Sequence, residues 1–343
     1  MNLPPYDFLS APLGIITLLH IITLGLHFAA MNFIVGGVII VLWGRFTGAP
    51  EHPVVQRFIA LFPAAMATTV TFGVAPLLFV QLVYPEQVYA AAIVGGWFWI
   101  SIPVAVIVAY SMLYAARFAE PGDGRRRRYL GIALVAMAYV SIVYTAVFAL
   151  AERPVLMQSL YAADQSGLSL NPEVMTYAFR WLHMILGAVT VGGFCVGVVG
   201  RDNEDAWRVG RRFFGFGMLA ASIVGIIFLF TLGDMLKPFM RSSGIYYLTV
   251  GIVLALGSLH LFFKRRLLTS GSLLFVSLLT MVASRHVLRD LRLAESYDPA
   301  ALTVSPQWGL FALFVVFFVI AIAVTVYMLR LFFVSGVAEA AER

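Results

Sequence analysis

Two histidines in apolar surroundings are the residues of this chain best suited to bind a cofactor. His27 and His183 share one frame: a leucine precedes each, a Val-Gly-Gly triplet follows, and a Gly-Arg pair closes the segment. A histidine is costly to keep in hydrocarbon without a partner, so two at matched depth predict a functional site. Imidazole is an axial ligand of haem iron, and the glycines would bare the helix face for a flat ring or a neighbouring helix. The alternative is a duplicated bundle whose glycines serve packing and whose histidines hydrogen-bond neighbouring helices.

Two more histidines are expected on the same side of the protein. His20 lies one heptad before His27 on a similar face, roughly 10 Å further out, and Thr176 holds the matching position in the second copy. His286 ends the eighth apolar segment and reaches the same surface. Both are candidates for second axial ligands. His52 lies in a loop, where solvation is expected, and for His260 an interfacial role is at least as plausible as ligation.

Arginines accompany these histidines on the side that carries few other basic residues. Arg180 lies one turn before His183, and Arg285 and Arg289 flank His286. Arginine is suited to pair with carboxylates in a partly desolvated setting, so these three residues are candidate partners of haem propionates. The alternative is interfacial anchoring, with Asp290 and Glu295 as the partners.

Composition places these residues in a polytopic membrane protein. Hydrophobic residues make up 61% of the 343 residues and charged residues 12%, with a mean hydropathy of +0.93. Apolar runs able to cross a bilayer core of roughly 30 Å predict an all-α fold with nine transmembrane helices. The expected spans are Ala11 to Gly44, Phe58 to Tyr84, Tyr89 to Phe118, Tyr129 to Leu150, Met175 to Gly200, Phe213 to Leu236, Gly244 to Phe263, Leu267 to His286 and Trp308 to Phe333.

The distribution of basic residues predicts the orientation. Arginine and lysine gather in alternate loops, which places the N-terminus outside and the C-terminus in the cytoplasm. The first span is expected to be retained, because no basic residue precedes it and it is too long for a signal-peptide core. The repeated frame then predicts two parallel four-helix repeats, residues 1–152 and 153–300, followed by a ninth helix and tail in 301–343. Arg57-Phe58 and Arg212-Phe213 open the second span of each copy.

Cysteine usage narrows the cofactor. Cys195 is the single cysteine and lies inside the fifth expected span. Disulfides, iron–sulfur clusters and covalent haem attachment are therefore excluded. Any haem is then b-type, and the two histidine frames predict at least two. The net charge of +6 follows from the basic loops and does not predict nucleic-acid binding.

The histidine segments resemble a known family. His27-Phe28, followed nine residues later by Gly36, and Arg180-Trp181-Leu182-His183 are similar to the haem-ligand helices of subunit I of cytochrome bd quinol oxidases. The resemblance implies nine spans, an outside N-terminus, His27 as ligand of the high-spin b haem and His183 as ligand of the low-spin b haem.

The chain also departs from that family. The long outer loop for quinol oxidation is reduced to about Lys237 to Gly244, and Thr249 stands where the family's second low-spin ligand, a methionine, is expected. The third span carries no glutamate for proton delivery. His20 and His286 are additional to the pattern and would supply bis-histidine haems suited to electron transfer rather than to oxygen reduction.

The sequence thus predicts a haem b electron-transfer subunit of the bacterial cytoplasmic membrane. Its expected partners are membrane lipid, the quinone pool and a periplasmic or membrane-bound cytochrome c, and a quinol:cytochrome c oxidoreductase would contain such a component. Quinone protons would pass to outer carboxylates, for which the candidates are Glu86, Glu152, Asp234 and Asp290. The alternatives are a bd-like terminal oxidase, a haem-free transporter, for which Pro63, Pro76 and Pro103 would break helices, and a membrane anchor of a larger complex.

Overall fold

Most of the described residues of this protein are helical. The computed structural model describes residues 8–46 and 51–341. Within them, nine helices are long and apolar enough to cross a membrane, which confirms the predicted all-α polytopic fold. The long helices are α1 (Leu13–Trp43), α2 (Pro53–Val83), α4 (Gly96–Phe118), α5 (Gly124–Leu150), α7 (Val174–Val199), α8 (Glu204–Phe230), α10 (Ser243–Phe263), α11 (Leu267–Leu293) and α12 (Trp308–Ala341).

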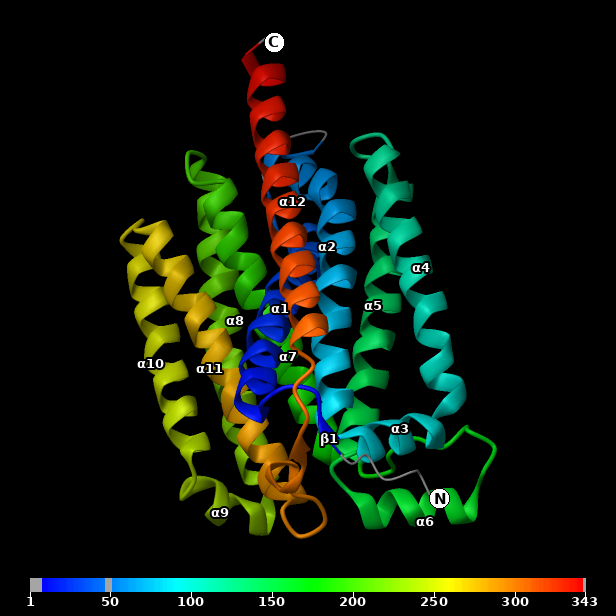
Figure 1. Ribbon diagram of the computed structural model, residues 1–343. Helices are drawn as coiled ribbons and strands as arrows, with labels where there is room; N and C mark the ends of the chain where they lie inside the picture. Colours follow the sequence, from blue (N-terminus) through cyan, green and yellow to red (C-terminus); the bar gives the residue numbers. More distant parts are fainter. Residues whose placement is uncertain (1–7, 47–50, 342–343) are drawn as a thin grey trace.

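Short elements gather at one end of the bundle, where α1 begins (Figure 1). They include α3 (Pro85–Val94), α6 (Pro154–Ala163), α9 (Leu236–Met240) and the 3-10 turns Gly233–Met235 and Pro299–Ala301. Strand β1 (Phe8–Leu9) pairs in parallel with β2 (Thr303–Val304), with Phe8 opposite Thr303. The charge bias assigns this end to the outside, and it is called the outer end below.

Helices α1 and α7 lie in the middle of the bundle, and the pairs α4–α5 and α10–α11 flank them (Figure 1). The first glycine of each repeated pair brings α1 and α7 together. A Cβ on Gly192 would lie 2.5 Å from the carbonyl carbon of Gly36, and a Cβ on Gly36 would overlap the carbonyl of Ala188. Only glycine permits helix backbones to approach this closely.

The second glycine of each pair packs against the next helix of its own repeat. A Cβ on Gly37 would lie 2.8 Å from the Phe62 ring of α2, and a Cβ on Gly193 would overlap the backbone of Phe214 in α8. These glycines therefore serve helix packing. Of the two occupants predicted for the bare helix face, a flat ring or a neighbouring helix, the structure shows the neighbouring helix.

Several expected span boundaries are wrong; the sixth span, for example, begins at Glu204 rather than at Phe213. The third span does not begin at Tyr89, because the chain turns at Gly95 and Trp97 N donates to the carbonyl of Gly167 at 3.0 Å. The short helix α3 therefore precedes α4. The eighth span does not end at His286, since α11 continues to Leu293 with its arginines paired to a buried carboxylate. The second span begins at Pro53, which suits the first turn of a helix because its missing N–H is not needed there.

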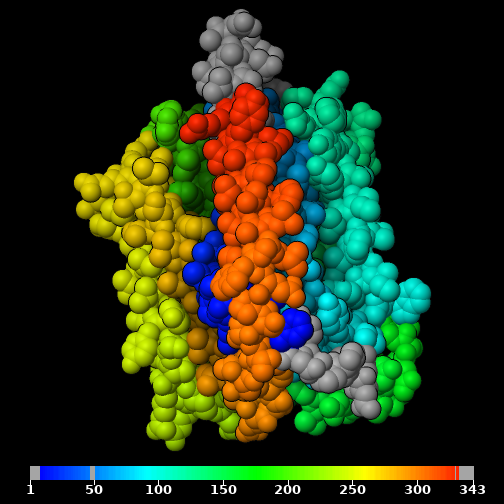
Figure 2. Space-filling model, in the orientation of Figure 1, coloured from blue at the N-terminus to red at the C-terminus, as the bar shows by residue number. Residues whose placement is uncertain are grey.

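Prolines do not break the transmembrane helices. Helix α2 continues through Pro63 and Pro76, and α4 continues through Pro103. The prediction of discontinuous helices at these prolines is therefore wrong. Helix α12 stands at the front of the bundle (Figure 2) and meets α2 through Phe318 against Phe72 and Phe314 against Phe79.

Candidate cofactor site at the outer end

His27 and His183 hold the same position in the two repeated sequence frames, which lie on α1 and α7. The Nδ1 atom of His27 lies 2.9 Å from the carbonyl oxygen of Thr69 in α2. The Nδ1 atom of His183 lies 2.8 Å from the carbonyl oxygen of Ala221 in α8. In each repeat the histidine of the first helix thus donates Nδ1–H to the second helix. This fixes the tautomer and leaves Nε2 with its lone pair, as metal-ligating histidines require.

A glycine lies beside each imidazole, one helical turn beyond the accepting carbonyl. A Cβ on Gly73 would lie 2.8 Å from His27 Nδ1, and a Cβ on Gly225 would lie 3.1 Å from His183 Nδ1. The ring therefore packs directly on the backbone of the neighbouring helix. Each glycine thus leaves space for an imidazole ring, and the side chain of any other residue at that position would fill this space.

Sequence reasoning missed these two glycines, although a signal was present. Gly225 lies 152 residues after Gly73, and Ala221 lies 152 residues after Thr69. The two histidines are 156 residues apart, so the second helices repeat at an interval four residues shorter. The suggested match of Arg57-Phe58 with Arg212-Phe213 is out of register by three residues. The reason is the shorter connection between α7 and α8, which shifts every later position of the second copy.

His20 repeats the arrangement of His27 one heptad further out. Its Nδ1 atom lies 3.1 Å from the carbonyl oxygen of Pro76, seven residues after Thr69 on α2. His20 is buried, and its ring centre lies 5.9 Å from that of His286 on α11. The structure therefore brings these two histidines together. His20 cannot share one iron with His27, because seven helical residues separate them by roughly 10 Å.

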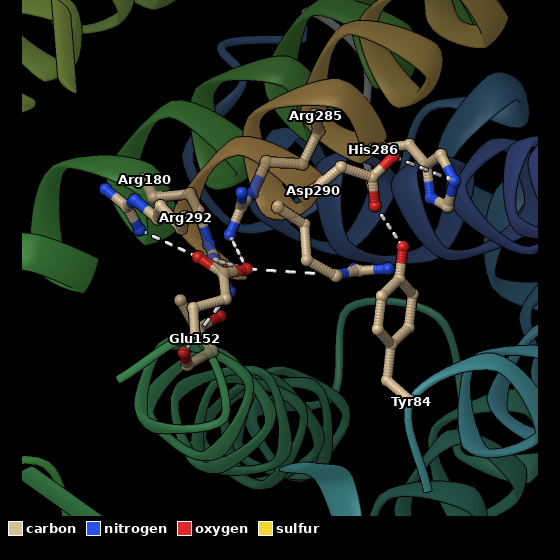
Figure 3. A network of polar contacts seen from close by, with 9 residues as sticks. Tyr84, Glu152, Arg180, Arg285, His286, Asp290 and Arg292 are labelled. Atoms are coloured by element: carbon tan, nitrogen blue, oxygen red, sulfur yellow. Dashed lines mark hydrogen bonds and ion pairs between the residues drawn. The ribbon is translucent and has the colours of Figure 1, made fainter. Parts of the chain in front are cut away.

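The predicted arginines converge on one buried carboxylate, that of Glu152 (Figure 3). Glu152 is 2% exposed. Arg285 donates to Oε1, and Arg292 Nη1 lies 2.7 Å from Oε2. Arg289 Nε lies 3.8 Å and Arg180 Nη1 lies 4.0 Å from Oε1. The ion pairs of these arginines are with Glu152 and not with Asp290 or Glu295, the partners expected for interfacial anchoring. The carboxylate lies just after α5, and the arginines come from α7 and α11, so the cluster joins the two repeats.

The charges in this cluster do not balance. Burial alone would raise the pKa of Glu152, but the surrounding guanidinium groups lower the pKa to about 2. The carboxylate is therefore charged at neutral pH and neutralises one of four arginines. In the described part of the chain, Nη1 of Arg285 and Nη1 of Arg289 are buried without a hydrogen-bond partner. Such donors favour an additional anion, for which a carboxylate is suited. Both carboxylate oxygens are held by arginines, so we assign Glu152 to the ion-pair cluster rather than to proton transfer.

A second polar group lies beside the arginines. Tyr84, which is 1% exposed, donates its hydroxyl to Asp290 Oδ1, and Asp290 Oδ2 lies 3.7 Å from His286 Nε2 (Figure 3). Arg289 stacks over the Tyr84 ring at 5.4 Å. Burial and the nearby Asp290 carboxylate raise the pKa of Tyr84, which keeps the phenol protonated. Asp290 is thus the one carboxylate of the four suggested that contacts the candidate ligands.

The other two histidines have different surroundings. His52 is not solvated: it is 5% exposed, and its Nδ1 accepts a hydrogen bond from Val54 N at the start of α2. It caps a helix whose first N–H groups lack intrahelical partners. His260 is exposed in the last turn of α10, at the inner end.

The described residues contain no group of three or more His, Cys, Asp or Glu side chains able to hold a metal ion. Comparison of the chain with family models, curated proteins and solved structures gives no match. The fold and the site together define an all-α polytopic membrane protein in which His27 and His183 are held alike.

Proposed function

We propose that this protein is a haem b membrane subunit that transfers electrons near its outer end. One observation carries the proposal: His27 and His183 are held alike, each by an Nδ1–H bond to the next helix and each against a glycine. Hydrogen bonding alone does not explain why both repeats keep a glycine beside the ring. Ligation explains it, because a ligand needs a fixed tautomer and a fixed ring plane.

The donor set suits haem better than a bare metal ion. A zinc or copper site needs three or four protein ligands, whereas haem supplies the equatorial ligands itself and needs one or two axial side chains. Isolated imidazoles in apolar surroundings therefore fit haem. When bound, the haem supplies one-electron redox chemistry.

The arginine cluster supports the same function. Arg180, Arg285 and Arg289 carry more positive charge than Glu152 neutralises, and haem brings two propionates. Two guanidinium Nη1 atoms lack partners, so we assign these arginines to propionate binding. Their location at the outer end would place the haem edge near a periplasmic partner.

We further propose that electrons pass between the quinone pool and a cytochrome c, in a bacterial cytoplasmic membrane. Asp290, with Tyr84 and His286 beside it, is the carboxylate placed to contact a quinol headgroup. Helices α2 and α4 run unbroken through their prolines, so the usual sign of a transporter is missing from them.

Stopped-flow reduction tests this function. The detergent-purified protein is mixed with a short-chain quinol, and its b-type absorption is followed before and after addition of oxidised cytochrome c. We expect reduction by quinol and reoxidation by cytochrome c. Reduction by dithionite but not by quinol would contradict the quinone partner, and sustained oxygen consumption with quinol alone would favour the bd-like oxidase.

A further inference from the structure

His20 and His286 form a pair at the contact between the two repeats. His20 belongs to α1 and His286 to α11, and these helices pack against each other. Their ring centres are 5.9 Å apart and the ring planes are inclined by 45°. Thr176 replaces His20 in the second repeat, so this pair has no symmetric counterpart.

Both rings offer a nitrogen for a ligand. His20 uses Nδ1 in its bond to Pro76, which leaves Nε2 available, as in His27. His286 has a buried Nδ1 without a partner, and its Nε2 lies 3.7 Å from Asp290, beyond hydrogen-bond distance. A buried imidazole nitrogen without a partner is costly, so its retention indicates a function.

We propose that His20 and His286 are the two axial ligands of one further haem, distinct from the centres at His27 and His183. The inference rests on the proposed haem function. Metal–nitrogen bonds of about 2 Å to one nitrogen of each ring would fit between ring centres that lie 5.9 Å apart. The spacing of the pair agrees with this. No third ligating side chain completes a site for a bare metal ion in the described residues.

The surroundings of the pair favour a propionate-bearing group. Arg289 lies over the Tyr84 ring, whose centre is 6.2 Å from that of His286, and its Nη1 is buried and unpaired. Arg285 also has an unpaired Nη1. The surplus charge of the arginine cluster therefore lies beside this pair.

The position gives this centre a role. His20 lies roughly 10 Å outward from His27 along α1. The bis-histidine centre would thus be the outermost of the chain and the point of contact for an external electron-transfer partner, while the His27 and His183 centres lie deeper. Bis-imidazole coordination leaves no open position, which suits electron transfer alone.

The test counts haem per polypeptide by pyridine haemochrome and records near-infrared magnetic circular dichroism of the oxidised protein. The variants are His20→Ala, His286→Ala and the double variant, with His260→Ala as the matched control. We expect each single variant to lose one haem and the bis-imidazole band, the double variant to lose no more than either single one, and the control to match the native protein.

His20→Met guards against a folding artefact. Methionine keeps an axial ligand, so we expect haem to be retained with a raised reduction potential. Unchanged haem content and an unchanged band in His20→Ala and His286→Ala would overturn the inference while leaving the centres at His27 and His183 intact. A colourless native protein would instead overturn the proposed function itself.

Discussion

Gly73 makes room for the His27 ring, and replacing it with alanine gives a calculable displacement. The added Cβ would lie 2.8 Å from Nδ1 and 2.9 Å from Cε1 of His27. Ordinary contact begins at about 3.5 Å, so the ring must retreat by roughly 0.7 Å. Its bond to Thr69, 2.9 Å long, would stretch to about 3.6 Å, where a hydrogen bond no longer exists.

We therefore expect Gly73→Ala to weaken haem binding at His27 by about 10- to 100-fold, the usual effect of losing the partner that orients a metal ligand. Gly225→Ala should have a smaller effect. Its Cβ would lie 3.1 Å from His183, and a retreat of roughly 0.4 Å leaves the bond to Ala221 near 3.2 Å, within the range of a weak hydrogen bond.

The assay is haem per protein after purification and again after incubation with apomyoglobin, which removes loosely held haem. Gly187→Ala is the matched control, because a Cβ there meets nothing within 4 Å and it lies on the helix of His183. Alanine also favours a helix over glycine by roughly 0.5–1 kcal/mol, so haem loss would not reflect a weaker helix. Full haem retention in Gly73→Ala, with an unchanged spectrum, would refute the reasoning.

Three further predictions concern the contact between the repeats. Glu152→Gln leaves buried guanidinium groups unpaired and should lower the free energy of unfolding by about 3–5 kcal/mol, measured by denaturant titration in detergent. The control Glu173→Gln, which breaks a half-exposed ion pair with Arg153, should lower it by less than about 1 kcal/mol. Equal losses of stability in the two variants would contradict the account. Because the pKa of Glu152 is lowered, its ion pairs stabilise the folded state fully at pH values above the ordinary pKa of 4.5, and this contribution disappears as the pH falls toward about 2. Glu152→Gln should remove this part of the dependence of stability on pH. An unchanged stability profile in acid would contradict this prediction. Gly192→Ala should force α1 and α7 apart and lower the melting temperature, whereas the open position Gly187→Ala should not; equal melting temperatures would refute the close crossing.

The sequence was sufficient to predict the elements that carry the site. The nine apolar runs and the repeated histidine frame follow from local composition and spacing, and the described residues contain nine such spans with several boundaries moved. The clustering of Arg180, Arg285 and Arg289 was foreseen from the charge bias, although their shared partner was not. Glu152 stands far from them in the chain. Only the packing of α5 against α7, and the ion pairs of Glu152 with the arginines of α11, bring them together.

Other features depend on helix rotation, which spacing does not determine. The proximity of His20 to His286 arises from the packing of α1 on α11 across the repeats. The roles of Gly36 and Gly73 could not be distinguished in advance, because both are glycines in apolar helices. Three-dimensional contacts show that one meets another helix and the other meets an imidazole. His52 was misjudged because a polar loop can still cap a helix and be buried.

The central claim is that His27 and His183 each bind a haem. The most direct test is the dithionite-reduced minus oxidised absorption spectrum of the protein made under haem-replete conditions, recorded for the native chain, His27→Ala and His183→Ala. We predict a b-type spectrum in the native protein and a different part of it lost in each variant. A colourless native protein, or variants with full b-type absorption, would contradict the claim.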